Sequence, residues 1–299
     1  MTRRTAKIGR TPIRSLEELE KSQNELDARF RQYLVSYKPD INLKMRKALE
    51  LRGAHKLHAV NLKCRFQLGT SLNDALKSHF RECRIATAYF VTLVSEVHAV
   101  NAAIGREHDL AAHRQWIASI LDGISFVGMI EPAYYPRVSF MPPSNEDWIS
   151  WHAHMVLWDV TAATLKELKR RVNSSESSFR PGASVFHFRK AQVCNIEAEV
   201  AYMCKSPRSE HYTYPVKRRI VDARTGEKRF TPTGTYKQNK REIRSGKLPI
   251  VLSALANKSI SSLCVSGAAG TRIVSMALSS AKLTLEKEKK ARDKTLQSL

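Results

Sequence analysis

The chain has 299 residues, and its 50 lysines and arginines against 28 acidic residues give a net charge of +22. Hydrophobic residues make up 42%, as in an ordinary soluble protein, and the absence of an apolar run of about 18 residues argues against a membrane span. No apolar segment follows the basic N-terminus, so a secretory signal is not expected. The five cysteines are dispersed and form no Cys-x-x-Cys pair, which favours a reducing compartment and a cytoplasmic location.

The positive charge is concentrated towards the two ends of the chain. Residues 1–85 contain 19 basic and 9 acidic residues, residues 86–214 contain 12 and 13, and residues 215–299 contain 19 and 6. A near-neutral middle between basic flanks is typical of a polyanion-binding protein, and nucleic acid fits better than an acidic membrane because no basic amphipathic helix stands out. We expect a basic, mainly helical region at 1–84, a core at 85–214 and a basic C-terminal extension at 215–299.

The N-terminal region is expected to be helical. After a basic, polar arm, Ser15 and Glu18 form a capping box, and apolar residues at helical spacing continue to about residue 36. Further helical stretches are expected between residues 41 and 82. This region could form a helical DNA-binding module.

The middle region alternates between strand and helix patterns. Strands are expected at 85–94, 125–131, 148–158 and 183–189, and helices at 109–121, 165–172 and 196–205. Pro132 is expected to end the second strand, and a proline-rich loop follows it. The order β-α-β-β-α-β-α predicts an α+β fold of the ferredoxin-like or RRM-like kind, an antiparallel sheet backed by helices.

Beyond residue 214 the chain is basic and rich in turns. Residues 218–229 are expected to form a charged hairpin, and the cations from Lys237 to Lys247 a short helix or turn. Residues 249–283 have no clear pattern, and residues 283–294 are expected to form a charged terminal helix or a frayed tail.

The most informative stretch is Trp148–Trp158, in which His152 and His154 stand two residues apart within an apolar run. Residues i and i+2 of a strand share a face, so the two imidazoles would project side by side while Trp151 and the other odd-numbered residues face a core. Two neighbouring imidazoles can form half of a metal site. Because a His-x-His pair also arises by chance, further ligands are needed.

Glu131 ends the strand that precedes the His-x-His strand. If the two strands pair antiparallel, its carboxylate lies beside both imidazoles, and the three donors leave open positions for water or substrate. Asp147 and Asp159 are competing ligands, and a glutamate at a strand end can equally be a solvated surface group. Oxygen and imidazole donors favour Mg²⁺ or Mn²⁺ on a phosphate substrate.

Tyr202 is the candidate nucleophile, with Glu199 and Lys205 three residues away on the same face of its helix. A phenol is a weak nucleophile at its ordinary pKa near ~10, so a metal that polarises the phosphate, or a nearby lysine, must assist it. A tyrosine in a helix usually packs in a core. Its position on the helix after the fourth strand singles Tyr202 out.

Three segments in this order resemble one known family. Tyr89–Leu93 is similar to the first strand motif of the HUH endonuclease superfamily, His152–His154 to its His-hydrophobic-His motif with alanine in the middle, and Tyr202–Lys205 to its Tyr-x-x-Lys motif. The resemblance covers about residues 85–207 and is to the rolling-circle replication initiator branch of the family.

The resemblance implies sequence-specific, metal-dependent nicking and strand transfer on single-stranded DNA, which starts rolling-circle replication of a plasmid, phage or mobile element. Tyr202 would attack the scissile phosphate to give a 5′-phosphotyrosine and a free 3′-OH, and Lys205 would help to place the phosphate or a metal-bound water. Glu199 is the candidate that activates water for the closing step. A replication-origin hairpin and a host helicase are the implied partners.

The same resemblance implies that His152, His154 and Glu131 hold the metal. The long insertion between Glu131 and His152 leaves the acidic ligand open. Tyr212 and Tyr214 are the alternative nucleophiles.

The proline-rich loop contains Tyr134, Tyr135 and Phe140, which could stack on unpaired bases or simply pack the loop.

Three other functions remain open. A relaxase or a transposase would carry out the same strand transfer, and no Walker A sequence points to a fused helicase. A non-catalytic DNA-binding protein on this fold would bind DNA without a covalent adduct. A cupin-like metal enzyme also uses His-x-His and glutamate, but the interleaved helices and only 12 glycines argue against it.

Overall fold

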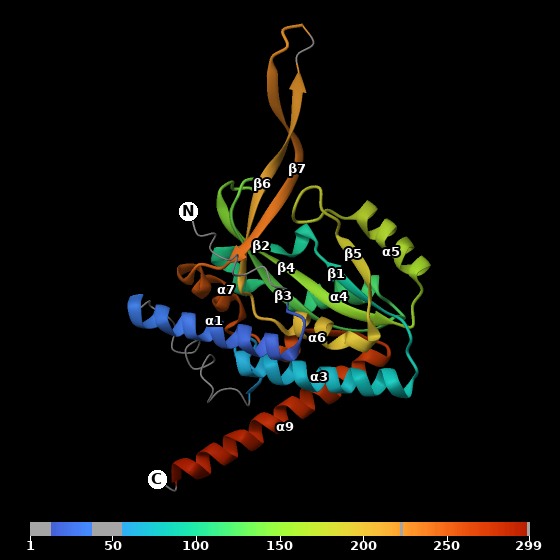
Figure 1. The fold of residues 1–299 in the computed structure, drawn as a ribbon, viewed down its shortest axis with the longest axis vertical. Coiled ribbons are helices and arrows are strands. Elements are labelled where there is room, and N and C mark those ends of the chain that lie inside the picture. Colours follow the sequence, from blue (N-terminus) through green and yellow to red (C-terminus); the bar gives the residue numbers. More distant parts are fainter. Residues whose placement is uncertain (1–12, 38–55, 222–223, 298–299) are drawn as a thin grey trace, which may run out of the picture.

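The computed structural model describes residues 13–37, 56–221 and 224–297, which form an α+β protein (Figure 1). The strands are β1 (Ala88–Leu93), β2 (Ala99–Asn101), β3 (Ser125–Val138), β4 (Glu146–Trp158), β5 (Phe186–Ala191), β6 (Ser209–Val221), β7 (Lys228–Glu242) and β8 (Cys264–Gly267). The α-helices are α1 (Leu16–Tyr37), α3 (Leu62–Glu82), α4 (Leu110–Ile120), α5 (Ala162–Ser175), α6 (Ile196–Cys204), α7 (Leu248–Leu255), α8 (Ile260–Leu263) and α9 (Ala269–Gln297). Short 3-10 turns are η2 (Glu96–His98), η3 (Ala102–Glu107), η4 (Val193–Asn195) and η5 (Ser245–Lys247).

The described strands form one curled, mixed sheet in the order β5-β1-β4-β3-β6-β7, with β2 added to β4 and β8 added to β3. The pairs β5–β1, β1–β4 and β4–β3 are antiparallel, whereas β3 meets β6 in parallel at Tyr134 and Glu210. The order of strands and helices predicted for the middle region is confirmed, with β2 and the 3-10 turns as additions.

One boundary in this region was predicted wrongly. Pro132 does not end the strand, because β3 continues through it to Val138 and remains paired with β4. On the side away from β4, β8 pairs with Phe126–Met129 of β3, and β6 pairs with β3 at Tyr134. Pro132 therefore lies between two partner strands, where no ladder bond needs the N–H that proline lacks.

The two faces of β4 pack against different helices. Trp158 lies edge-on to Phe80 of α3, with 5.4 Å between ring centroids, and His154 lies on this same face. Trp151 faces the other way and stacks on His108, which follows η3. The predicted strand is confirmed, and Trp151, Ala153 and Met155 are fully buried as expected. Ser150, His154, Val156 and Trp158 are buried too, so both faces of β4 are covered.

The N-terminal helices pack on the body of the protein. The Ser15 hydroxyl accepts a hydrogen bond from the Glu18 N–H (3.1 Å), so the expected cap of α1 is present. Helix α3 packs against α6 and α9, and its apolar residues belong to the same large core as the sheet. The helical stretches expected between residues 41 and 55 lie outside the described residues.

The C-terminal region contributes to the same sheet and core. The expected regional boundary at 214/215 falls inside β6, and α7, α8, β8 and α9 fill the stretch that had no clear pattern. The first turn of α9 is in close backbone contact with β3, since a Cβ on Gly270 would stand 1.8 Å from the carbonyl oxygen of Phe126. All five cysteines are free, and none of the described helices is long and apolar enough to cross a membrane.

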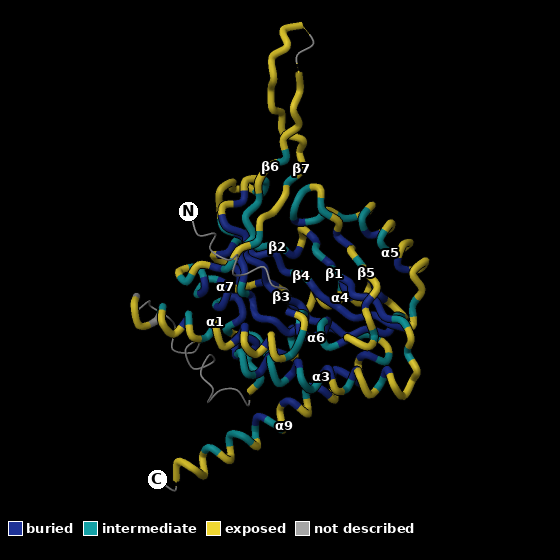
Figure 2. Tube along the Cα trace, in the orientation of Figure 1, coloured by how far each residue is buried: buried dark blue, intermediate teal, exposed yellow. Residues whose placement is uncertain are grey.

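Strands β6 and β7 form an arm that projects from the body (Figure 1). Lys237, Lys240 and Arg241 lie on β7, so the short helix or turn expected for this part of the chain is wrong. Their spacing could not reveal a strand, because β7 is exposed on both faces and carries no apolar alternation (Figure 2).

Candidate active site

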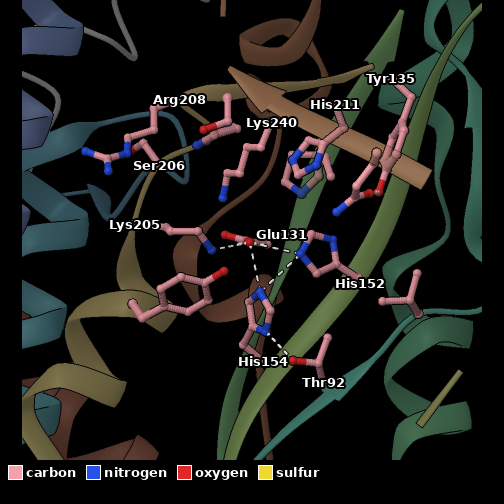
Figure 3. Close-up of a pocket in the computed structure, with 17 residues that line it drawn as sticks. Thr92, Glu131, Tyr135, His152, His154, Lys205, Ser206, Arg208, His211 and Lys240 are labelled. Carbon is pink, nitrogen blue, oxygen red and sulfur yellow. Dashed lines mark hydrogen bonds and ion pairs between the residues drawn. The ribbon is translucent and has the colours of Figure 1, made fainter. Parts of the chain in front are cut away.

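The pairing of β3 with β4 brings the three expected ligands together. Glu131 stands directly opposite His152 in the register. Its Oε1 atom lies 2.9 Å from His152 Nε2 and 3.1 Å from His154 Nε2, and the two imidazole nitrogens are 3.2 Å apart (Figure 3). One donor atom from each side chain therefore reaches a common point, within 4.8 Å of the others.

Hydrogen bonds on the outer side of each imidazole orient its ring. His152 Nδ1 lies 3.4 Å from the carbonyl oxygen of Ser150, and His154 Nδ1 lies 2.9 Å from the hydroxyl of Thr92 on β1. In the absence of a metal ion the Nε2–H groups can donate to Glu131. A metal ion bound here would require the proton of each ring on Nδ1, where the Ser150 carbonyl and the Thr92 hydroxyl can accept it.

The carboxylate of Glu131 is buried but charged. Burial alone would raise its pKa, but the Lys205 ammonium and the hydrogen bonds from His152 and His154 hold that pKa well below its usual range. Its Oε2 atom has no hydrogen-bond partner among the described residues. A buried carboxylate oxygen without a partner is costly, so two imidazoles and this carboxylate fit a divalent cation.

Helix α6 supplies the candidate nucleophile and its neighbouring cation. Lys205 caps the helix and forms a buried ion pair with Glu131, and its Nζ lies 3.9 Å from the centre of the Tyr202 ring. The Tyr202 ring lies 4.9 Å from the His154 ring, and these side chains line one cavity of about 310 Å³. Burial raises the pKa of the Tyr202 phenol, while the Lys240 ammonium opposes that rise.

The sequence did not point to Lys240 or His211 as part of the site. Both line the cavity from the base of the β6–β7 arm, and Lys240 extends towards Glu131 and Lys205 (Figure 3). No hydrogen bond or ion pair with another described residue holds the Lys240 ammonium. Arg208 adds a third cation to the lining. The sequence shows a run of basic residues from Lys237 to Lys247. Only the pairing of β7 with β6 shows that Lys240 is the member of this run that lines the cavity.

Glu199 lies outside the ligand cluster. Both of its carboxylate oxygens accept hydrogen bonds from the Arg189 guanidinium, at 2.7 and 2.6 Å. It lines a second cavity of about 640 Å³, which shares Tyr202 and His154 with the first. The ion pair occupies both oxygens, so Glu199 could accept a proton from water only if Arg189 released one of them. The role of Glu199 in activating water stays a prediction.

The competing ligands are held elsewhere. The Asp147 carboxylate accepts hydrogen bonds from the Tyr134 hydroxyl (2.5 Å) and the Lys247 ammonium (2.9 Å). Asp159 is exposed at the end of β4 and has a positive φ of 55°. Glu131 is therefore the acidic residue that joins the two histidines.

The aromatic residues assigned to the proline-rich loop are not free to stack on bases. Tyr134 and Tyr135 belong to β3 and are 0% and 7% exposed, so their assignment to a loop was wrong. Phe140 lies in the loop but packs against Phe179, with 5.4 Å between ring centroids.

The alternative nucleophiles sit on the arm. Tyr212 lies under the Arg241 guanidinium, 3.7 Å from ring centre to carbon, and Tyr214 is 48% exposed. Neither lines the cavity that Tyr202 shares with the histidines.

A second cluster of buried histidines was not foreseen. The rings of His98 and His113 stack in parallel at 3.7 Å, and His108 Nε2 lies 3.1 Å from His113 Nδ1. Burial lowers their pKa values to about 4 for His98, about 3 for His108 and about 2 for His113. Parallel rings cannot both aim in-plane lone pairs at one ion without rotating, so we assign this cluster to packing behind Trp151.

The first cluster therefore places three side chains that could hold a metal ion in one cavity with a phenol and basic side chains, an arrangement suited to polarising and attacking a phosphate ester. Comparisons of the chain with protein-family models, with curated proteins and with solved structures found no match.

Proposed function

We propose that this protein nicks single-stranded DNA and joins itself to the cut strand through Tyr202, with Mg²⁺ or Mn²⁺ held by Glu131, His152 and His154. The observation that carries this proposal is the convergence of three metal-ligand atoms within 4.8 Å, in the same cavity as Tyr202 and Lys205. A site of two imidazoles and one carboxylate has open positions for phosphate oxygens. A bound divalent cation would neutralise charge on the scissile phosphate.

The side chains of this chain supply the remaining parts of the reaction. The oxygen of Tyr202 attacks phosphorus as its O–H bond breaks, the bond from phosphorus to the 3′ oxygen breaks, and that oxygen takes up a proton. The products are a 5′-phosphotyrosine and a free 3′-OH. Because no water enters the first step, the 3′-OH can later attack the phosphotyrosine and rejoin the strand.

The cations around the cavity fit an anionic substrate. Lys205 is committed to Glu131, so it holds the carboxylate charged and lies over the Tyr202 ring. Lys240 and Arg208 line the same cavity and offer positive charge to the phosphates on either side of the cut. Lys240 also opposes the burial that raises the pKa of the phenol, which favours the phenolate as leaving group in the reverse step.

The topology supports the family resemblance. The strand order β5-β1-β4-β3, with antiparallel neighbours throughout, is that expected of a ferredoxin-like sheet, and the three motifs of the resemblance lie on β1, β4 and α6 around one cavity. We infer an HUH-type nuclease that starts rolling-circle replication. A relaxase or transposase would use the same first step.

The test is capture of a covalent adduct. The protein is incubated with a 3′-end-labelled, random-sequence single-stranded DNA library and Mn²⁺, then boiled and separated on a denaturing gel, because the 3′ fragment is the one that stays joined to Tyr202. We expect a labelled band at the protein's position, which chelator or the substitution His152→Ala removes. Sequencing the captured strands reads out the nick site.

Tyrosine variants make the assignment of the nucleophile specific. Tyr202→Phe should lose the band, and the matched variants Tyr212→Phe and Tyr214→Phe should keep it. A band that persists in Tyr202→Phe would show that another residue attacks. A wild-type protein that binds the library but never forms a chelator-sensitive adduct would show that the proposed reaction is wrong.

A further inference from the structure

We infer that the β6–β7 arm is a binding element for double-stranded DNA, which holds the duplex that flanks the nick site. This inference rests on the proposed function, because it names the partner that lies next to the same cavity. The main observation is that the arm is a solvent-exposed, cationic two-stranded ribbon, and residues at its base line that cavity.

The outer part of the arm packs against nothing in the described chain. Every residue of 217–221 and 228–233 is exposed (Figure 2). From Pro215 to the end of β6 the ribbon extends roughly 20 Å, at about 3.3 Å per residue. An isolated two-stranded ribbon is only marginally stable, so a long one without a core is explained best by a partner that binds it.

The exposed part of the ribbon is strongly basic. Its cations without a hydrogen bond or ion pair to any other described residue are Lys217, Arg218, Arg219, Lys228 and Lys237. Arg229 is the exception, since it pairs with Glu227 at 2.9 Å. Such an excess of free cations fits a polyanion.

The cations occupy both faces of the ribbon. Arg219 stands opposite Phe230 and Val221 opposite Lys228, so these four side chains share a face with Lys217. The alternate face carries Arg218 opposite Thr231 and Ile220 opposite Arg229. A ribbon with positive charge on both faces can reach the phosphates on both sides of a groove.

This geometry favours duplex over single-stranded DNA. The major groove is about 12 Å wide and admits a two-stranded ribbon. A single strand is typically bound in a concave basic groove with several aromatic platforms. This arm is a projecting rod on which the exposed aromatic side chains among the described residues are Phe230, at 65%, near the outer end and Tyr214, at 48%, near the base.

The base of the arm ties the bound duplex to the reaction site. Tyr135 on β3 donates a hydrogen bond to Gln238 on β7 (3.2 Å), and its ring stacks on His211 of β6 at 4.9 Å. His211, Gln238 and Lys240 all line the cavity of Tyr202. A duplex held on the arm therefore begins beside the point where the single strand enters.

The test compares duplex and single-strand binding by fluorescence anisotropy. The probes are a hairpin with a stem of about two helical turns and a single-stranded tail, and that tail alone. The arm variant is Lys217→Ala/Arg218→Ala/Arg219→Ala/Lys228→Ala. A matched variant removes four cations of α9, at the opposite end of the molecule: Lys287→Ala/Lys289→Ala/Lys290→Ala/Lys294→Ala. A shortened protein joins Val216 to Thr233 through Asn-Gly.

We expect the arm variant and the shortened protein to bind the hairpin at least about tenfold more weakly, with the slope of log affinity against log salt reduced by up to about 3.6. Binding of the tail alone and adduct formation on single-stranded DNA should stay within about threefold of wild type. Equal hairpin affinity in the arm variant, or an equal loss in the α9 variant, would overturn the inference. A wild type that binds the hairpin through the arm but forms no adduct would instead refute the proposed reaction and leave the arm's role intact.

Discussion

The buried Glu131–Lys205 pair makes a sharp prediction about stability. Glu131 is 4% exposed and Lys205 is 7% exposed, and the two side chains form an ion pair between β3 and the end of α6. Glu131→Gln removes the negative charge and leaves the ammonium buried without it. Breaking one side of a buried ion pair costs about 3–5 kcal/mol, a large part of the roughly 5–15 kcal/mol that stabilises a typical protein.

The double variant separates the lost charge from the lost ligand. Glu131→Gln/Lys205→Met has no uncompensated charge, so we expect it to recover most of the stability that Glu131→Gln loses. Both variants should fail to form the covalent DNA adduct, because each lacks the carboxylate ligand. Glu167→Gln is the matched control, since Glu167 pairs with Arg170 on the exposed face of α5 and its loss should leave the unfolding midpoint almost unchanged.

The assay is urea unfolding at neutral pH in the presence of a chelator, with the free energy of unfolding taken from the midpoint and slope. If Glu131→Gln lowers that free energy by less than about 1 kcal/mol, the ammonium is not held by this carboxylate. If the double variant is no more stable than Glu131→Gln, the cost arises from lost hydrogen bonds and not from the unpaired charge.

Two further predictions concern the fold. Burial lowers the pKa values of His98, His108 and His113, so below their ordinary pKa near ~6.5 the unfolded chain binds protons that the folded chain does not. In chelator, the free energy of unfolding should therefore fall by about 1.4 kcal/mol per histidine per pH unit between about pH 6 and pH 4. Equal stability at pH 7 and pH 5 would contradict this. Gly270→Ala should destabilise the protein by at least about 2 kcal/mol, because the added methyl group would stand 1.8 Å from the Phe126 carbonyl oxygen. The control Gly246→Ala places its methyl group in open space and should change the stability little. Equal urea midpoints for the two variants would refute the close approach.

The sequence alone was sufficient for features that depend on local periodicity. The alternation around His152 and His154 placed both imidazoles on one face of a strand, and the succession of patterns along residues 85–206 predicted the order of elements. The expected position of Glu131 beside His152 followed from antiparallel pairing of two consecutive strands, although the long insertion between them left the acidic ligand open until the register was known. These inferences need only the chain's own spacing, because strands that are consecutive in the sequence usually pair.

The tertiary structure decided what depends on distant partners. Pro132 stays within β3 because β8 and β6, from the far C-terminal side, leave a gap beside it. Lys240 enters the cavity because β7 returns along β6 in a register that no local pattern encodes, since a ribbon exposed on both faces has no apolar alternation. Tyr135 is buried for the same reason: residues from the arm cover it, and burial by long-range neighbours has no signature in a single stretch of sequence.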